Sequence, residues 1–178
     1  MKTSLPARST QSGFTLVELS IVLVIIGLIV GGVLAGQDMI RAAEIRSTVS
    51  QIEKYNTAVN TFRDKYGNLP GDILQVDAAR FGFTTRAGTN GQGDGDRQIE
   101  AAATTTTVLG HESALFWRDL SQVALVDNGF VTATDIPAAS LTPSTMSQYL
   151  PPAKIGLGHF IAVYSSGGRN YFEIARVV

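Results

Sequence analysis

Apolar residues dominate one uninterrupted stretch near the start of the chain, from Phe14 to Gly36. As a helix rising ~1.5 Å per residue, this stretch would be about 34 Å long, enough to cross a hydrocarbon core of ~30 Å. It is longer than the apolar core of a secretory signal, which has about 7–15 residues. The pattern therefore predicts a membrane-spanning helix over 14–36.

Residues 37–66 have a different pattern, in which apolar residues are interspersed with charged and polar ones at helical spacing. Apolar side chains recur at steps of three, four and seven, as on one face of a helix: Ile45, Val49, Ile52, Val59, Phe62 and Tyr66. No proline interrupts 14–66, and Gly67 and Pro70 are typical helix terminators. We therefore expect one continuous helix of about 50 residues, with an amphipathic half over 37–66.

The rest of the chain, 67–178, has the shorter periods of a small mixed domain. Helical spacing occurs within 72–83 and 114–125, where Trp117 is expected in the core. Two apolar runs, 159–164 and 171–178, flank a glycine-containing turn and predict a β-hairpin. The threonine-rich stretch 101–108 could be a loop or an edge strand, and 136–152 reads as a surface connection. The fold class expected is α+β: an antiparallel sheet of three or four strands packed on the long helix.

Glu18 is the one acidic residue inside the predicted span. A charge in a membrane helix costs roughly 2.5–3.5 kcal/mol on insertion scales, so such residues usually have a function and a partner. The alternative is a chance glutamate that reaches water at the membrane surface. Small-x-x-x-small patterns, which allow close helix packing, occur later in the span at Gly27, Gly31, Gly32 and Gly36.

The sequence Gly-Phe-Thr-Leu-Val-Glu over 13–18, followed by the apolar run, resembles the N-terminal signature of the type IV pilin and type II secretion pseudopilin superfamily. Lys-Tyr-Gly-x-Leu-Pro over 65–70 also resembles the end of a pseudopilin stem helix. The resemblance implies a pilin-like lollipop with a cleaved cytoplasmic leader over 1–13. A prepilin peptidase would cut after Gly13 and methylate the new amine of Phe14; an uncleaved signal anchor is the alternative.

Cleavage would create a cationic amine beside an apolar surface, and Glu18 is its obvious counter-ion, either in its own chain or in a neighbour within a filament. Our hypothesis is that Glu18 docks each subunit in register against the Phe14 amine of a neighbour in a helical filament. By resemblance, the partners are like or related pilin subunits and an inner-membrane assembly platform with an ATPase. Lys2 and Arg8 precede the span and predict a cytoplasmic N-terminus and a periplasmic head, 67–178, in the bacterial inner membrane.

Composition narrows the function further. The net charge of −1 argues against nucleic-acid binding, and exposed basic candidates are scattered: Arg80, Arg86, Arg97 and Arg169. Many pilins close a loop with a disulfide, so the absence of cysteine favours a pseudopilin over a type IV major or minor pilin of adhesion, motility or DNA uptake. His111 and His159 are the only histidines and form no zinc motif, so no enzyme is expected.

The loop 88–96 is rich in glycine and oxygen-bearing side chains. Asn90, Asp94 and Asp96 could wrap a calcium ion, because hard cations take six to eight oxygen ligands. The loop lacks the glutamate that completes a calcium-binding hand, so a solvated loop without a metal is the alternative.

Overall fold

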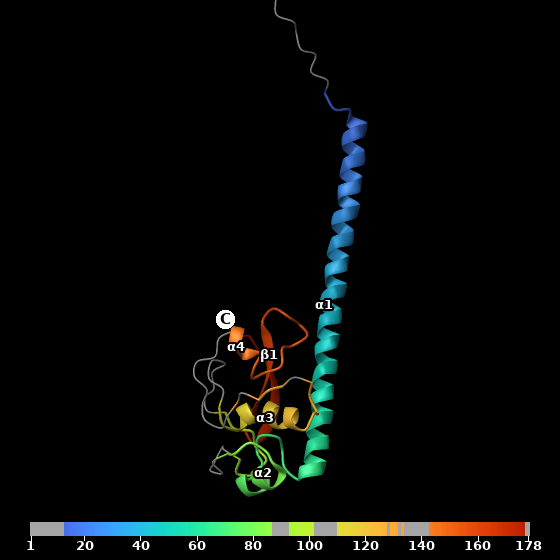
Figure 1. Cartoon of the computed structure of the whole chain (residues 1–178). Helices are drawn as coiled ribbons and strands as arrows, with labels where there is room; N and C mark the ends of the chain where they lie inside the picture. The colour runs from blue at the N-terminus through green and yellow to red at the C-terminus, as the bar shows by residue number, and fades with distance from the viewer. Residues whose placement is uncertain are drawn as a thin grey trace, which may run out of the picture. The chain divides into compact units, whose positions relative to one another are not determined.

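The computed structural model describes residues 13–86, 93–101, 110–127, 129–131, 133 and 143–176. The chain divides into two compact units, Met1–Ala42 and Ala43–Val178. Helix α1, Leu16–Tyr66, extends from the first unit into the second (Figure 1). The fold class is α+β, as expected.

The first unit contains the apolar part of α1. From Leu16 to Ile40, its large hydrophobic side chains are exposed by half or more. The helix is long and apolar enough to cross a membrane, and none of its apolar window is buried. Exposed apolar surface on this scale requires an apolar environment, since water disfavours it. The predicted continuous helix is confirmed, with its end at Tyr66.

The second unit begins with the amphipathic part of α1. Of the predicted apolar stripe, Phe62 is buried and Ile52, Val59 and Tyr66 pack against the core. Ile45 and Val49 are exposed, contrary to the prediction, so the apolar stripe meets the core only from Ile52 onward. The helix ends where Gly67 adopts a left-handed φ of 79° and donates its N–H to the carbonyl of Arg63. Glycine accepts this conformation readily, which explains the termination.

Three shorter helices follow. Helix α2, Gln75–Phe81, falls within the predicted 72–83 segment, and α3, His111–Gln122, begins three residues before the predicted helix over 114–125. Helix α4, Pro143–Met146, is a single turn within the stretch predicted to be a surface connection. Buried Asp72 and Glu112 precede α2 and begin α3, respectively.

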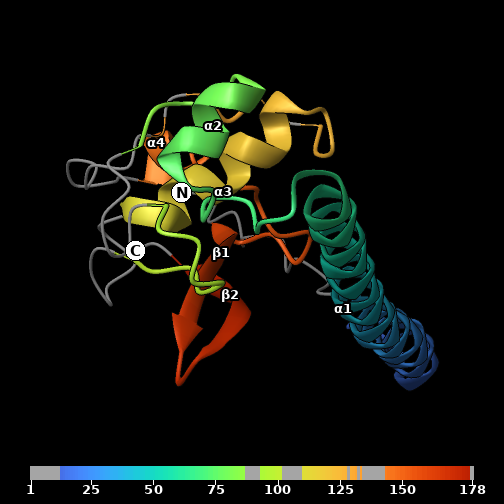
Figure 2. The same ribbon diagram turned by 90° about the horizontal axis from the view of Figure 1, so that it is seen from below.

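The sheet is the predicted hairpin. Strands β1, His159–Ser166, and β2, Arg169–Arg176, pair antiparallel, with Val163 opposite Phe172 (Figure 2). Gly167 and Gly168 form the turn with φ of 58° and 73°. The described residues contain these two strands, fewer than the three or four expected. Residues 102–108 of the candidate edge strand lie outside the described part of the chain.

Aromatic side chains fill the core of the second unit. Trp117 of α3 is fully buried, which confirms the prediction for this residue. Its ring lies 4.7 Å from that of Tyr55 on α1 and 6.1 Å from that of Phe172 on β2. The indole therefore contacts aromatic side chains from both α1 and β2.

Arg86 corrects the expectation that it is an exposed basic residue. Its side chain is buried and forms a salt bridge of 2.8 Å with the equally buried Asp119 on α3. Asp119 also accepts the N–H of Gly71 at 2.7 Å. The pair therefore fastens the turn after α1 to α3.

Candidate functional site

The start of α1 is closed by a reciprocal set of hydrogen bonds between Thr15 and Glu18. The Thr15 amide and hydroxyl both donate to Glu18 Oε2 at 2.8 Å. In return, the Glu18 amide donates to Thr15 Oγ1 at 3.2 Å. This arrangement is a capping box, in which two otherwise unpaired helix N–H groups are satisfied by side chains.

All three bonds leave one carboxylate oxygen unused. Two of them end on Oε2 of Glu18, whereas Oε1 has no hydrogen bond to any residue that the structure describes. The carboxylate also lies at the N-terminal end of the helix, where the macrodipole favours negative charge. Glu18 therefore has a defined position within its own chain and one oxygen available to a partner.

The predicted processing site lies immediately before this cap. Gly13 and Phe14 precede α1 and are exposed, Phe14 by 86%. A Cβ added to Gly13 would meet nothing within 4 Å. The backbone at the predicted cleavage position is thus open within the described residues. Residues 1–12 of the predicted leader lie outside them.

The small-residue patterns of the span lie on α1 as expected. A Cβ added at any of these glycines would meet nothing within 4 Å: Gly27, Gly31, Gly32 and Gly36. Packing within the described chain therefore does not explain the absence of side chains there.

A second group of carboxylates lies in the other unit. Asp72, Asp94 and Glu112 each offer one oxygen, and these oxygens all lie within 4.8 Å of one another. Asp72 and Glu112 are completely buried. The three residues come from the turn after α1, a glycine-rich loop and the start of α3. We name them the acidic triad; it could hold one metal ion.

Backbone N–H groups of the loop 93–100 surround the acidic triad. Asp72 accepts the amides of Gly95 and Arg97, both at 2.7 Å. Glu112 accepts the amides of Gly93 at 2.7 Å and Glu100 at 3.1 Å. The two buried carboxylates therefore hold this loop against the start of α3.

Burial also raises the proton affinity of both carboxylates. It raises the pKa of Asp72 to about 6, against the lowering effect of the Arg97 and Gly95 amides, and nearby Asp96 and Asp94 raise it further. Burial and the side chain of Glu100 raise the pKa of Glu112 to about 9. Charged carboxylates this close repel one another unless a proton or a cation intervenes.

The residues predicted to bind calcium have different places. Asp94 belongs to the acidic triad, whereas Asn90 lies outside the described residues. Asp96 is exposed, and its carboxylate accepts the backbone and side-chain N–H groups of Gln98 at 2.7 Å. The geometry therefore brings Asp94 together with Asp72 and Glu112, which the sequence analysis did not single out.

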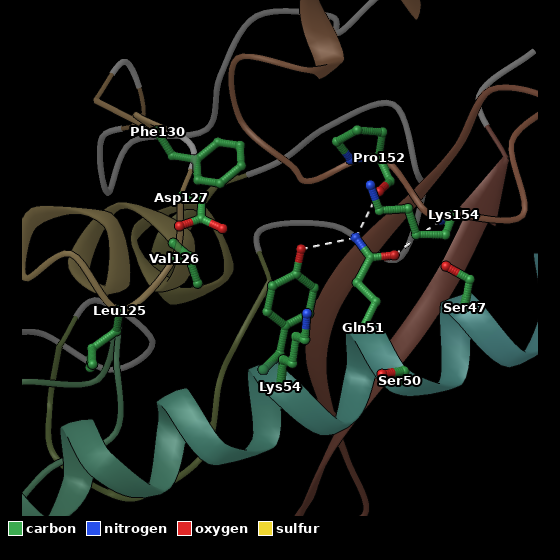
Figure 3. A pocket seen from close by; sticks show the side chains of 11 residues that line it. Ser47, Ser50, Gln51, Lys54, Leu125, Val126, Asp127, Phe130, Pro152 and Lys154 are labelled. Carbon is green, nitrogen blue, oxygen red and sulfur yellow. Dashed lines mark hydrogen bonds between the residues drawn. The ribbon is translucent and has the colours of Figure 1, made fainter.

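A groove of about 450 Å³ also lies in this unit (Figure 3). At its edge, Gln51 of α1 donates to the Tyr55 hydroxyl and to the Pro152 carbonyl, both at 2.9 Å, and accepts the Lys154 amide at 3.0 Å. The side-chain amide of Gln51 thus ties α1 to the segment before β1. The full lining is Ser47, Ser50, Gln51, Lys54, Tyr55, Leu125, Val126, Asp127, Phe130, Pro152 and Lys154.

Two features of these sites were missed at the level of sequence, for different reasons. Thr15 precedes Glu18 by three residues, and Thr-x-x-Glu before an apolar run is a recognised capping-box signal. Asp72 and Glu112 are 40 residues apart (112 − 72). No local pattern links them, because tertiary folding alone brings them together.

Comparison with known proteins identifies the start of the chain. Residues 8–34 match the family model described as the prokaryotic N-terminal methylation motif. No curated protein and no solved structure matches the chain. The match covers the open backbone at Gly13, the capping box and most of the apolar part of α1. The chain therefore carries the prepilin-type N-terminal signature of type IV pilins and pseudopilins.

Proposed function

We propose that this protein is a structural subunit of a pilus-like filament, and specifically a pseudopilin of type II secretion. The observation that supports the proposal is the methylation motif at the start of α1. It includes Glu18 in the first turn of the helix, followed by an exposed apolar surface. A subunit with this segment is stored in the membrane and then buries the same surface against other subunits. It has a structural role and does not catalyse a reaction.

Processing prepares the subunit for assembly. A prepilin peptidase removes residues 1–13 and methylates the amine of Phe14. The new ammonium group of one subunit then pairs with the Glu18 carboxylate of its neighbour. Two charges leave water together at an acceptable cost only when they pair, and removal of one partner strands the other at a cost of ~3–5 kcal/mol. The pair therefore selects one register between neighbouring helices.

The division of the chain follows from this role. Residues 14–36 form the membrane span and later the filament core, 37–66 form the amphipathic stalk, and 67–178 form a periplasmic head. The positive charges of Lys2 and Arg8 keep the leader cytoplasmic. An inner-membrane platform with an ATPase supplies the energy for assembly.

The choice of pseudopilin over pilin rests on the absence of cysteine and on the Lys-Tyr-Gly-x-Leu-Pro sequence over 65–70. A deletion strain separates the two functions. Loss of protein secretion with retained surface pili supports a pseudopilin, whereas loss of pili with normal secretion contradicts it and indicates a type IV pilin.

Substitution of Glu18 tests the filament role directly. We expect Glu18→Val and Glu18→Gln to leave the processed subunit in the membrane and to abolish filaments in sheared fractions. Glu44→Gln, on the part of α1 beyond the span, is the matched control and should assemble normally. Normal filament yield from both Glu18 variants would refute pairing through this carboxylate.

We also propose that the acidic triad binds calcium. Its donors are carboxylate oxygens, which suit a hard cation, and water would complete a shell of six to eight ligands. A divalent cation would offset the cost of burying the charged forms of Asp72 and Glu112 and the repulsion between them. It would thereby stabilise the loop 93–100 in the arrangement described above.

Isothermal titration of the full chain in detergent micelles with calcium tests this site. Asp94→Ala should abolish the binding heat. Asp96→Ala, two residues later in the same loop and outside the acidic triad, should retain it. Equal titration curves for the two variants would place calcium elsewhere, and the absence of heat with the unmodified chain would exclude the site.

A further inference from the structure

The two oxygens of the Glu18 carboxylate have different surroundings. Oε2 accepts two hydrogen bonds from Thr15, whereas Oε1 has no hydrogen bond to any described residue. The hydroxyl of Thr15 takes part in two of the three bonds of the capping box, as donor to Oε2 and as acceptor from the Glu18 amide. Thr15 is thus the side chain that fixes the position of this carboxylate.

We propose that Thr15 is a positioning residue for assembly: it commits Oε2 of Glu18 to its own helix and leaves Oε1 to receive the amine of the neighbouring subunit. This inference rests on the filament role proposed above and assigns the two oxygens separate tasks. Thr15 does not touch the neighbour and acts through Glu18.

The physical reason is pre-organisation. A glutamate side chain loses rotamer freedom when it is ordered, and this loss opposes docking if it occurs at the moment of contact. The capping box orders the side chain beforehand, within the membrane-bound subunit. It also gives Oε2 hydrogen-bond donors while no neighbour is present. This lowers the cost of placing the carboxylate in an apolar environment, where an unpaired polar group is unfavourable.

The cap and the docking contact do not compete. A carboxylate offers about four lone-pair sites on two oxygens, so Oε2 can remain in the capping box while Oε1 pairs with an ammonium group. A glutamine at position 18 would preserve the cap, since Gln also serves at this position of a capping box. The glutamine side chain has no charge, so Glu18→Gln removes the ion pair and keeps the capping box. This variant therefore tests the ion pair separately from the cap.

The test uses the full chain in its native membrane together with the assembly machinery. Thr15→Val keeps the β-branched shape and removes the hydroxyl, whereas Thr15→Ser keeps the hydroxyl. Ser20→Ala is the control, because the Ser20 hydroxyl donates to the Val17 carbonyl at 2.8 Å and not to Glu18. Sheared filament is measured per molecule of processed subunit, so that any effect on leader removal is counted separately.

We expect Thr15→Val to lower this ratio about fivefold, the change in an equilibrium constant that corresponds to the typical loss of helix stability when an N-terminal cap is removed. Thr15→Ser and Ser20→Ala should both match the unmodified chain. A normal ratio for Thr15→Val, or no recovery with Thr15→Ser, would overturn the positioning role. Failure of the filament proposal would look different: the unmodified chain itself would then be absent from sheared filaments.

Discussion

At the scale of single residues, the most consequential interactions involve charges that the fold has buried. Arg86 and Asp119 form a two-pronged ion pair: Nη2 lies 2.8 Å from Oδ1, and Nη1 lies 3.1 Å from Oδ2. Nη1 also donates to the Gly71 carbonyl at 3.2 Å. Buried pairs of this kind are stable only while both partners are present.

Removal of Asp119 should therefore destabilise the second unit strongly. Asp119→Ala leaves the Arg86 guanidinium buried without its counter-ion, and we expect the free energy of unfolding to fall by ~3–5 kcal/mol. Urea unfolding in detergent micelles, followed by the fluorescence of Trp117, measures this change. Asp64→Ala, at an exposed position on α1, should change it by less than ~0.5 kcal/mol. Equal effects of the two substitutions would contradict this account of the ion pair.

The acidic triad predicts an unusual dependence of stability on pH. The pKa of Asp72 is about 6 in the folded chain and near 3.8 when unfolded, and that of Glu112 is about 9 against 4.5. For each carboxyl group, at a pH between its unfolded and its folded pKa, the folded state binds more protons than the unfolded state. The free energy of unfolding therefore falls as the pH rises through this range. Without a metal ion, the free energy of unfolding should be lower at pH 7.5 than at pH 5 by on the order of 4–5 kcal/mol.

The same Trp117 measurement at the two pH values, with a chelator present, checks this expectation. Calcium added at pH 7.5 should restore most of the loss, because the cation takes the place of the protons. A stability that rises from pH 5 to pH 7.5 in the presence of chelator would show that the two carboxylates are charged and well compensated in the folded state.

At the scale of elements, the turn after α1 decides how this helix meets α3. Gly67 and Gly71 both have left-handed φ, 79° and 88°, but their surroundings differ. A Cβ at Gly67 would meet nothing within 4 Å, whereas one at Gly71 would overlap the carbonyl of Glu112. Gly67 is therefore needed only for its backbone conformation. Gly71 is also needed because its backbone lies close to the Glu112 carbonyl of α3.

Two alanine substitutions should separate these requirements. Gly67→Ala should cost ~1 kcal/mol, the typical penalty of a left-handed conformation for a residue with a Cβ. Gly71→Ala adds the steric overlap and should cost ~3 kcal/mol in total. Thermal unfolding of the two variants in micelles compares them, and equal losses of stability would contradict the close packing of Gly71 on α3.

Much of the element order could be predicted from local patterns. The uninterrupted apolar stretch, the stripe ending at Tyr66 and the glycine turn of the hairpin each report on neighbours in sequence, and these elements are present. The described residues contain two strands where three or four were expected, and 102–108 of the candidate edge strand lie outside them. Strand pairing depends on the tertiary fold.

The sites were predictable to different degrees for the same reason. Glu18 stood out because a charge within an apolar helix is costly, whereas the role of Thr15 required its hydrogen bonds. Arg86 was expected to be exposed, since nothing near it in sequence indicates Asp119, 33 residues later. Buried charge networks are composed of distant residues, and hydropathy alone assigns such residues to the surface.

At the scale of the whole molecule, the proposed function makes the apolar part of α1 first a membrane anchor and then a filament core. Both roles use the exposed apolar residues of α1 in the first unit. On the proposed function, assembly requires the leader to be absent, because the amine of Phe14 would exist only after cleavage. Whether the leader has been removed in cells therefore decides whether Glu18 can pair with a neighbour's amine and whether the proposed filament can form.

Mass spectrometry of the N-terminal peptide from the membrane-bound and filament-bound protein tests this central claim most directly. We predict that the mature chain begins at N-methylated Phe14 wherever a prepilin peptidase is present, and at Met1 where its gene is deleted. A filament-bound chain that retains residues 1–13, or one cut at another position, would contradict the account.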